Sequence, residues 1–194
     1  MKKRLIWLGI TIAVLAILYS ATIGKYNALV ISEESVKTER SQVQNVYQRR
    51  ANLIPNLVAT VKGEANFEKQ TLTDVINARA SASQVKVDVN NTEELAKYQA
   101  AQGQLSQALG RLMVLTENYP SLQANQSFRD LMVQLEGTEN RIAVEIRNYN
   151  TAAKNYNTQI RIFPTSIIAK IFDFQRANLF EATTGAEVAP TVEF

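Results

Sequence analysis

The stretch NYNTAAKNYNTQIRIFP, residues 148–164, repeats the triplet Asn-Tyr-Asn after seven residues and stops at a proline, Pro164. Seven residues are close to two turns of an α-helix, so Tyr149 and Tyr156 fall on one face. Apolar residues continue this face upstream at helical spacings, which predicts a helix over about residues 125–162. Its expected inward positions are Phe128, Leu131, Leu135, Ile142, Ile146, Tyr149, Ala153, Tyr156, Ile160 and Phe163.

The asparagines of the repeat, Asn150 and Asn157 among them, flank this seam at the expected edge of the core, where side-chain amides need hydrogen-bond partners. One interpretation is a structural polar ladder between helices, and it requires nothing beyond a folded bundle. The alternative is a groove that binds a peptide or a glycan. The role of the repeat therefore bears on whether the protein binds a ligand in a groove or uses these residues only to hold its own fold together.

Three more helices are expected before this one. The first continues from the N-terminus to Gly63 along the seam Leu29, Val36, Val43, Tyr47, Ile54, Leu57 and Val61. The second covers about residues 66–82, with Phe67, Leu72, Val75, Ile76 and Ala80 inward. The third covers about residues 92–118, with Thr92 as its N-cap and the seam Leu95, Tyr98, Leu105, Leu109 and Leu112. A short apolar helix is expected at 167–174.

Four long helices joined by short loops predict an all-α fold, an up-down-up-down four-helix bundle. The alternative is an extended coiled-coil hairpin. A second row on the third helix, formed by Ala96, Gly103 and Gly110, favours the bundle because small residues let a neighbouring helix approach closely.

The N-terminus has the pattern of a membrane anchor. Three basic residues precede the apolar stretch Leu5 to Ile23, whose 19 residues would span about 28 Å as a helix. The alternative is a cleaved signal peptide, but the stretch is long for one and its end, residues 19–23, lacks a clean small-x-small cleavage site. The basic cluster places the N-terminus in the cytoplasm by the positive-inside rule. The expected organisation is a cytoplasmic terminus (1–4), a transmembrane anchor (5–24), a helical-bundle body outside the cytoplasm (25–181) and a disordered tail (182–194).

The composition excludes several functions. The 194 residues include no Cys and no His, which rules out Cys/His zinc sites, thiol nucleophiles and Ser-His-Asp triads. Four of the 21 basic residues lie in residues 1–25, which leaves 17 basic against 18 acidic residues in the body. A near-neutral body argues against nucleic-acid binding.

Carboxylate pairs are the remaining basis for catalysis. Glu64 with Glu68, and Glu136 with Glu139, are spaced to share a helix face. Di-iron sites in helical bundles use Glu-x-x-His, which this chain lacks. A solvated charged face is the simpler interpretation, so no catalytic, cofactor or metal site is predicted.

Three residues of the first helix break its pattern. Pro55 lies inside the helix and frees the carbonyl of Ala51, which Asn52, Asn56 or water is expected to meet. Arg40 and Arg50 occupy seam positions, so each must reach water, a carboxylate or a partner.

The membrane-proximal part of this helix is expected to extend beyond the other three. Leu29, Val30 and Val36 would then need a cover, which predicts a lateral homo-oligomer in the membrane.

Seven phrases of the chain carry a family resemblance. They are YNALV (26–30), RANLIPNLVATVKG (50–63), INAR (76–79), ALGRL (108–112), ENYPSLQAN (117–125), TENRIAVEIRNYN (138–150) and YNTQIRIFP (156–164). In order and spacing they resemble the LemA family of small bacterial membrane-anchored proteins, from Gly24 to Glu181. The resemblance implies an N-terminal anchor, a helical body and no established catalytic activity. One relative contributes to magnetosome membranes, which suggests a membrane-organising role.

The chain departs from the family pattern at several places. Arg40 stands where relatives often have Trp, Asn52 replaces Asp, and Asp173 replaces a usual Gly. The family's Gly-Tyr-Ala-x-His-Glu becomes GEANFE at 63–68, with Glu64 and Phe67 at the changed positions. If Trp, Asp and His form one functional patch in relatives, this chain has lost or changed it.

These observations predict a non-enzymatic, single-pass scaffold or interaction protein of the bacterial inner membrane. The alternative is an accessory subunit of an envelope enzyme, such as a membrane protease or a wall hydrolase. The protein partner is unknown, and no cofactor is expected. The candidate interaction or structural residues are Tyr26, Asn27, Arg40, Pro55, Asn56, Tyr149, Asn150, Tyr156, Asn157 and Pro164.

Overall fold

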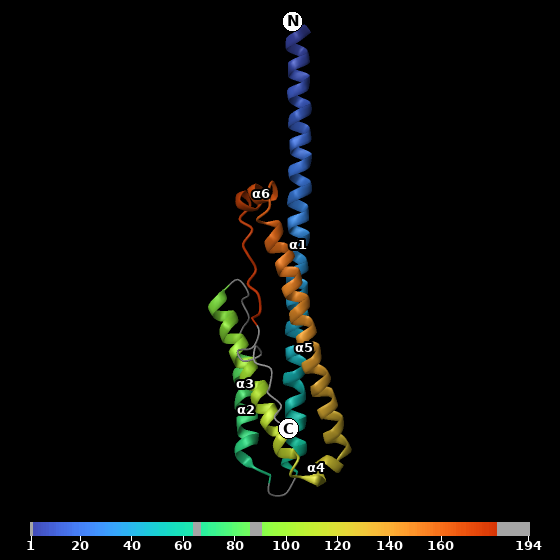
Figure 1. Cartoon of the computed structure of the whole chain (residues 1–194), viewed down its shortest axis with the longest axis vertical. Helices are drawn as coiled ribbons and strands as arrows, with labels where there is room; N and C mark the ends of the chain where they lie inside the picture. The colour runs from blue at the N-terminus through green and yellow to red at the C-terminus, as the bar shows by residue number, and fades with distance from the viewer. Residues whose placement is uncertain (1, 64–66, 86–90, 182–194) are drawn as a thin grey trace, which may run out of the picture.

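The computed structural model describes residues 2–63, 67–85 and 91–181, and within these ranges every regular element is a helix (Figure 1). The predicted all-α class is confirmed. The helices are α1 (Lys2–Lys62), α2 (Lys69–Gln84), α3 (Thr92–Thr116), α4 (Pro120–Ala124), α5 (Gln126–Gln159) and α6 (Thr165–Ile171).

Helix α1 is a single element of 61 residues that begins at Lys2, just before the apolar N-terminal stretch, and ends at Lys62, next to Gly63. Its N-terminal part projects from the body (Figure 1). Among the described residues it is the one helix long and apolar enough to cross a membrane, and its best 18-residue window has a mean hydropathy of 2.2 with none of it buried. The predicted seam from Leu29 to Val61 is buried throughout, so the periodicity of this helix is confirmed.

The other helices form the bundle on the rest of α1. Helix α5 packs along α1, and α2 pairs with α3 (Figure 1). The chain passes down α1, up α2, down α3 and up α5, which confirms the up-down-up-down arrangement over the coiled-coil hairpin. Helix α4 makes the distal turn into α5, and α6 caps α5 at the end from which the N-terminal part of α1 projects.

The core has two parts. The proximal core joins α1, α5, α6, the segment after α6 and the N-terminal part of α3, around Leu29, Val36, Tyr149 and Tyr156. The distal core joins α1, α2, α3 and α5, around Ile54, Leu57, Val75, Leu105 and Leu135.

The burial of Leu29 (0% exposed) and Val36 (5% exposed) removes the reason given for a lateral homo-oligomer. The expectation that these side chains need a second copy to cover them was wrong. Residues 160–180 fold back over this part of α1 and supply the cover from the same chain.

Four local predictions were also wrong. Ile76 is 41% exposed and Ala80 is exposed, because α2 pairs mainly with α3 and buries a narrow stripe. Helix α3 is capped by Asn91, whose Oδ1 accepts hydrogen bonds from the backbone N–H groups of Glu93 and Glu94, and not by Thr92.

The second row of α3 makes no close helix contact, since a Cβ added at Gly103 or Gly110 would meet nothing within 4 Å. Phe163 is 80% exposed because α5 ends at Gln159, so the helical period no longer applies there. Glu64, residues 86–90 and the tail 182–194 lie outside the described residues.

Candidate functional site

The Asn-Tyr-Asn repeats lie on the C-terminal half of α5 and face the proximal core. Tyr149 is 0% exposed and Tyr156 is 2% exposed, as the seven-residue spacing predicts. The first asparagine of each triplet, Asn148 or Asn155, is exposed, whereas Asn150 is half-buried and Asn157 is buried. Each repeat therefore presents one tyrosine and one asparagine inward.

These inward side chains bind an extended segment that follows α6, residues 175–181, which we call the strap. The strap runs back from α6 alongside α5 (Figure 1). The Asn157 amide donates to the carbonyl of Ala177 (2.8 Å) and accepts from the N–H of the same residue (2.9 Å). The Asn150 amide makes the same pair of bonds to Phe180, both at 2.9 Å. Each amide thus imitates the edge of a neighbouring β-strand.

The tyrosine hydroxyls complete the contact. Tyr156 donates to the carbonyl of Gln175 (2.8 Å), and Tyr149 donates to the carbonyl of Asn178 (2.7 Å). Equivalent bonds therefore recur every seven residues on α5 and every three residues on the strap. Seven helical residues rise about 10.5 Å and three extended residues cover about 10 Å, so the two periods match. The repeat in the sequence is explained by this match in length.

The bonds answer the question raised by the repeat. A polar ladder exists, but it joins a helix to an extended segment, so the expectation of a ladder between helices was wrong. The contacts are those of a peptide-binding groove, and their occupant is the chain's own strap. Sequence reasoning missed the strap because backbone donors and acceptors are present in every residue and leave no signal in the sequence.

Burial determines the ionisation of both tyrosines. Loss of water around the ring raises the pKa of Tyr149 to about 12 despite the opposing charge of Arg40. Burial raises the pKa of Tyr156 to about 12 as well, with a smaller contribution from Glu33. At neutral pH both hydroxyls are therefore protonated and act as donors to the strap carbonyls.

Arg50 forms the second polar cluster, in the middle of the bundle. Its side chain, 1% exposed, extends from α1 to Glu139 on α5, with Nη1 at 2.5 Å from Oε1. Nη1 also donates to Ser106 Oγ (2.7 Å) and Nη2 donates to Gln102 Oε1 (2.5 Å), both on α3. One guanidinium thus joins three helices.

The Arg50 contact changes the interpretation of the Glu136 and Glu139 pair. Glu136 is exposed, but Glu139 is partly buried and pairs with the guanidinium, so the expected solvated face was wrong for Glu139. The Arg50 guanidinium also lies over the ring of Tyr47, with Cζ at 5.1 Å from the centroid. Burial raises the pKa of Tyr47 to about 12, so that ring also stays neutral.

Pro55 is exposed on α1, and the carbonyl that it frees on Ala51 accepts a hydrogen bond from Arg79 Nε on α2 (2.8 Å). The expectation that Asn52, Asn56 or water meets this carbonyl was wrong. Asn56 is exposed, and Asn52 accepts a bond from Gln48 on the same helix. The proline therefore provides an anchoring point for α2.

Arg40 is half-buried on α1 and lines a small hollow of about 230 Å³ that also includes Asp173 and Gln175. Its Nε is one of two buried side-chain polar atoms without a hydrogen-bond partner in the described part of the chain. Asp173 has φ 56°, in the left-handed region where glycine is favoured, which explains the usual Gly at this position. It lies two residues after the end of α6 at Ile171, directly after the C-cap residue Phe172.

Arg40 shares its hollow with Asp173, but the positions where relatives have Trp, Asp and His do not gather into one patch. Arg40 and Asn52 are separated by about 18 Å of helix rise on α1. Phe67 is buried in the distal core, where its ring lies 4.8 Å from that of Tyr119. A single functional patch at these positions is therefore not formed.

The remaining candidates lie at the proximal end. Tyr26 packs against Phe172, with ring centroids 4.7 Å apart, and against Phe174 at 5.8 Å. Asn27 is exposed, and Pro164 is an exposed residue immediately before α6.

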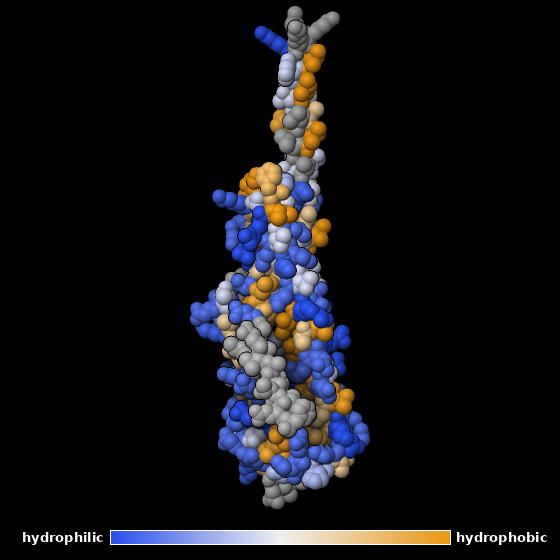
Figure 2. Space-filling model, viewed as in Figure 1, coloured by the Kyte–Doolittle hydropathy of each residue, from blue (hydrophilic) through white to orange (hydrophobic). Residues whose placement is uncertain are grey.

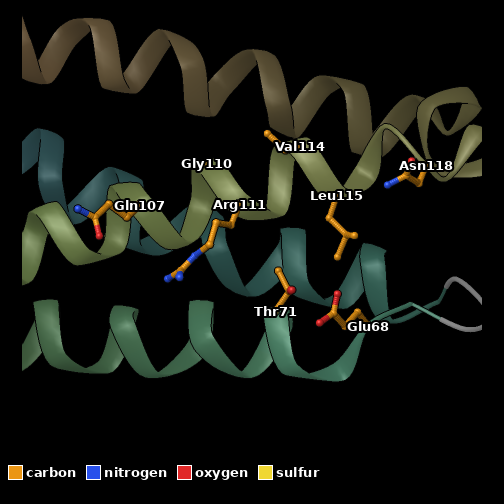
Figure 3. A pocket seen from close by; sticks show the side chains of 8 residues that line it. All are labelled: Glu68, Thr71, Gln107, Gly110, Arg111, Val114, Leu115 and Asn118. Atoms are coloured by element: carbon orange, nitrogen blue, oxygen red, sulfur yellow. The ribbon is translucent and has the colours of Figure 1, made fainter.

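An open hollow of about 600 Å³ lies between the start of α2 and the C-terminal half of α3 (Figure 3). In the close-up, Glu68 and Thr71 face α3, whereas Val114 points away from α2. Glu68 and Arg111 are both exposed, so neither charge is held in a fixed, dry environment. This geometry selects no ligand.

Comparison with known proteins places the chain in a family. The model of the LemA family matches residues 39–194. Protein LemA of Metamycoplasma hominis is 27% identical over 172 residues, which cover 89% of this chain and 76% of the relative. Magnetosome protein MamQ 2 of Paramagnetospirillum magneticum is 30% identical over 176 residues, or 81% of this chain and 65% of the relative. Magnetosome protein MamQ of Magnetospirillum gryphiswaldense is 28% identical over 192 residues, or 89% and 71%. A match of this extent, across the body that contains both polar clusters, means that the chain belongs to the LemA family.

Proposed function

We propose that this protein is a non-enzymatic, single-pass scaffold of the bacterial inner membrane that presents its helical body to protein partners outside the cytoplasm. The observation that carries the proposal is the continuity of α1. One helix contains both the apolar span and the seam of the bundle, so no joint separates the anchor from the body. From Lys25 to Lys62 this helix extends about 57 Å beyond the span.

The polar clusters support a structural role. The inward groups of the Asn-Tyr-Asn repeats are engaged by the strap, and the Arg50 guanidinium is engaged by two helices. Groups held in this way fix the shape of the body and are not presented to a substrate. The relatives named as magnetosome proteins support a role at a membrane.

Topology is tested by cysteine labelling. Because the chain has no cysteine of its own, only the introduced cysteine can react. Val133 on α5 is 69% exposed, so Val133→Cys should react with a membrane-impermeant maleimide in intact cells. The matched control is Arg4→Cys before the span, which should react only after the membrane is opened. Labelling of Val133→Cys only in lysed cells would mean that the body lies in the cytoplasm and that the proposed orientation is wrong.

The scaffold role is tested by photo-crosslinking in native membranes. A photoreactive amino acid at Val114 or Val133, both exposed on the body, should capture structural proteins of the envelope, further copies of this chain, or both. Capture of one enzyme, whose turnover falls when this protein is deleted, would instead identify an accessory subunit. The same amino acid at Leu105, which is 0% exposed, is the negative control.

A further inference from the structure

The proximal end of the body carries a cluster of exposed apolar side chains. Within residues 161–172, which we call the α6 cap, the large side chains that reach solvent are Ile162 (51%), Phe163 (80%), Ile167 (52%), Ile171 (69%) and Phe172 (53%). The opposite side of the cap is buried, with Thr165 and Ile168 each 7% exposed. One side of the cap thus packs into the proximal core, and the other side presents a second apolar face to solvent.

The location of this face is informative. In the space-filling view, apolar atoms of the cap gather at the end of the body beside the projecting part of α1 (Figure 2). The cap is held there by Tyr26, whose ring lies 4.7 Å from that of Phe172. Leu29, one turn further along α1, is fully buried in the core that includes Ile168. The cap is therefore fixed to α1 and does not hang from a free linker.

The distance to the span can be counted along α1. Ile23 is the last residue of the apolar stretch, and Tyr26 follows it by three residues, or about 4.5 Å of helix rise. The polar headgroup layer of a bilayer is roughly 5–7 Å thick on each side. A cap attached at Tyr26 lies at the depth of that layer when the span crosses the hydrocarbon.

The charges around the cap fit the same position. Lys25, Arg161 and Lys170 are exposed at its edges, and Asp173 is the acidic residue that follows it. Lysine and arginine side chains extend readily toward lipid phosphates, while aromatic and aliphatic side chains enter the boundary below them. An apolar face with a basic edge at this level matches a lipid surface containing anionic headgroups.

We propose that the α6 cap inserts its exposed apolar face, centred on Phe163 and Ile167, into the outer leaflet of the membrane that α1 crosses. The protein then touches the bilayer at two points, the span and the cap. Because the span already holds the cap at the surface, insertion is an intramolecular step and needs little affinity of its own. Two contacts fix both the tilt of the body and its rotation about α1.

The test uses the full chain in nanodiscs of phosphatidylethanolamine and phosphatidylglycerol. Phe163→Cys and Ile167→Cys carry an environment-sensitive fluorophore. Val133→Cys is the matched control, because Val133 is an apolar side chain on the distal half of α5 whose exposure (69%) lies between those of Phe163 (80%) and Ile167 (52%). The cap probes should emit at shorter wavelength, lose most of their emission to lipids with a nitroxide near the top of the acyl chain, and be protected from iodide. The Val133 probe should emit at longer wavelength, keep its emission in the presence of nitroxide lipid and be quenched by iodide.

Two outcomes would overturn the proposal. Quenching of the cap probes by iodide to the same degree as the Val133 probe would mean that the face stays in water. Protection from iodide without quenching by nitroxide lipid would mean that protein, such as a second copy, covers it. In a further variant, Phe163→Asp with Ile167→Asp should abolish lipid quenching of a probe at Ile171→Cys. Its melting temperature in detergent should stay unchanged, since all three side chains point outward.

Discussion

Replacing Glu139 by alanine should lower the free energy of unfolding by about 3 kcal/mol, because the substitution leaves the Arg50 charge buried without its counter-ion. The guanidinium is 1% exposed and cannot turn to water, whereas the Glu139 side chain is 36% exposed. The estimate is the low end for a broken buried ion pair, since water that reaches Glu139 replaces part of what is lost. Urea unfolding of the full chain in detergent, followed by circular dichroism, measures the change.

Because Arg50 is buried and Glu139 is partly exposed, removing one partner of the pair should cost more than removing the other. Arg50→Met removes the buried charge itself and leaves a carboxylate that reaches solvent, so it should cost less than Glu139→Ala. The double variant Arg50→Met with Glu139→Gln should recover much of the loss, because neither charge remains. Lys97→Ala, which breaks an exposed pair with Glu93 on α3, is the matched control and should leave the unfolding curve unchanged. Equal costs for Glu139→Ala and Arg50→Met would mean that the guanidinium is hydrated after all.

The long helices were predictable because one physical rule governs them. An apolar seam residue recurs every three or four positions. In helices as long as α1, α3 and α5 this pattern repeats too many times to be a chance arrangement. Leu29 to Val61 on α1 and Leu95 to Leu112 on α3 are buried as the periodicity requires. The prediction failed where the period ended, as at Phe163, four residues beyond the end of α5.

The polar contacts were not predictable because their partners are distant in the chain or belong to the backbone. Arg50 signalled a need for a carboxylate, but nothing in the sequence distinguished Glu139 from the exposed Glu136. The carbonyl freed by Pro55 was recognised, yet its donor, Arg79, comes from the next helix. The strap has no periodic pattern, and its bonds to α5 use N–H and C=O groups that any residue would offer.

The effect of Tyr156→Ala follows from the two contacts that its side chain makes. The ring is 2% exposed in the proximal core, and its hydroxyl donates to the carbonyl of Gln175. Loss of a buried aromatic ring costs on the order of 3–5 kcal/mol, and a protein of ordinary stability would then be close to unfolding. Tyr156→Phe keeps the ring and removes one hydrogen bond, so it should cost about 1 kcal/mol.

Comparison of these two variants separates a structural role from a binding role for the Asn-Tyr-Asn repeats. If the repeats hold the strap, the free energy of unfolding should fall from wild type to Tyr156→Phe and further to Tyr156→Ala. Protease should cleave near Gln175 soonest in Tyr156→Ala, because the strap detaches before the bundle unfolds. Asn157→Ala removes both amide bonds to Ala177 and leaves those buried backbone groups unpaired, so its strap should also be cleaved early although the ring remains. The strap of Asn155→Ala, changed at the exposed asparagine of the same triplet, should resist protease as the wild type does. If Tyr156→Ala instead melts at the wild-type temperature and loses a crosslinked partner, α5 binds that partner through the repeat and the strap is a removable occupant.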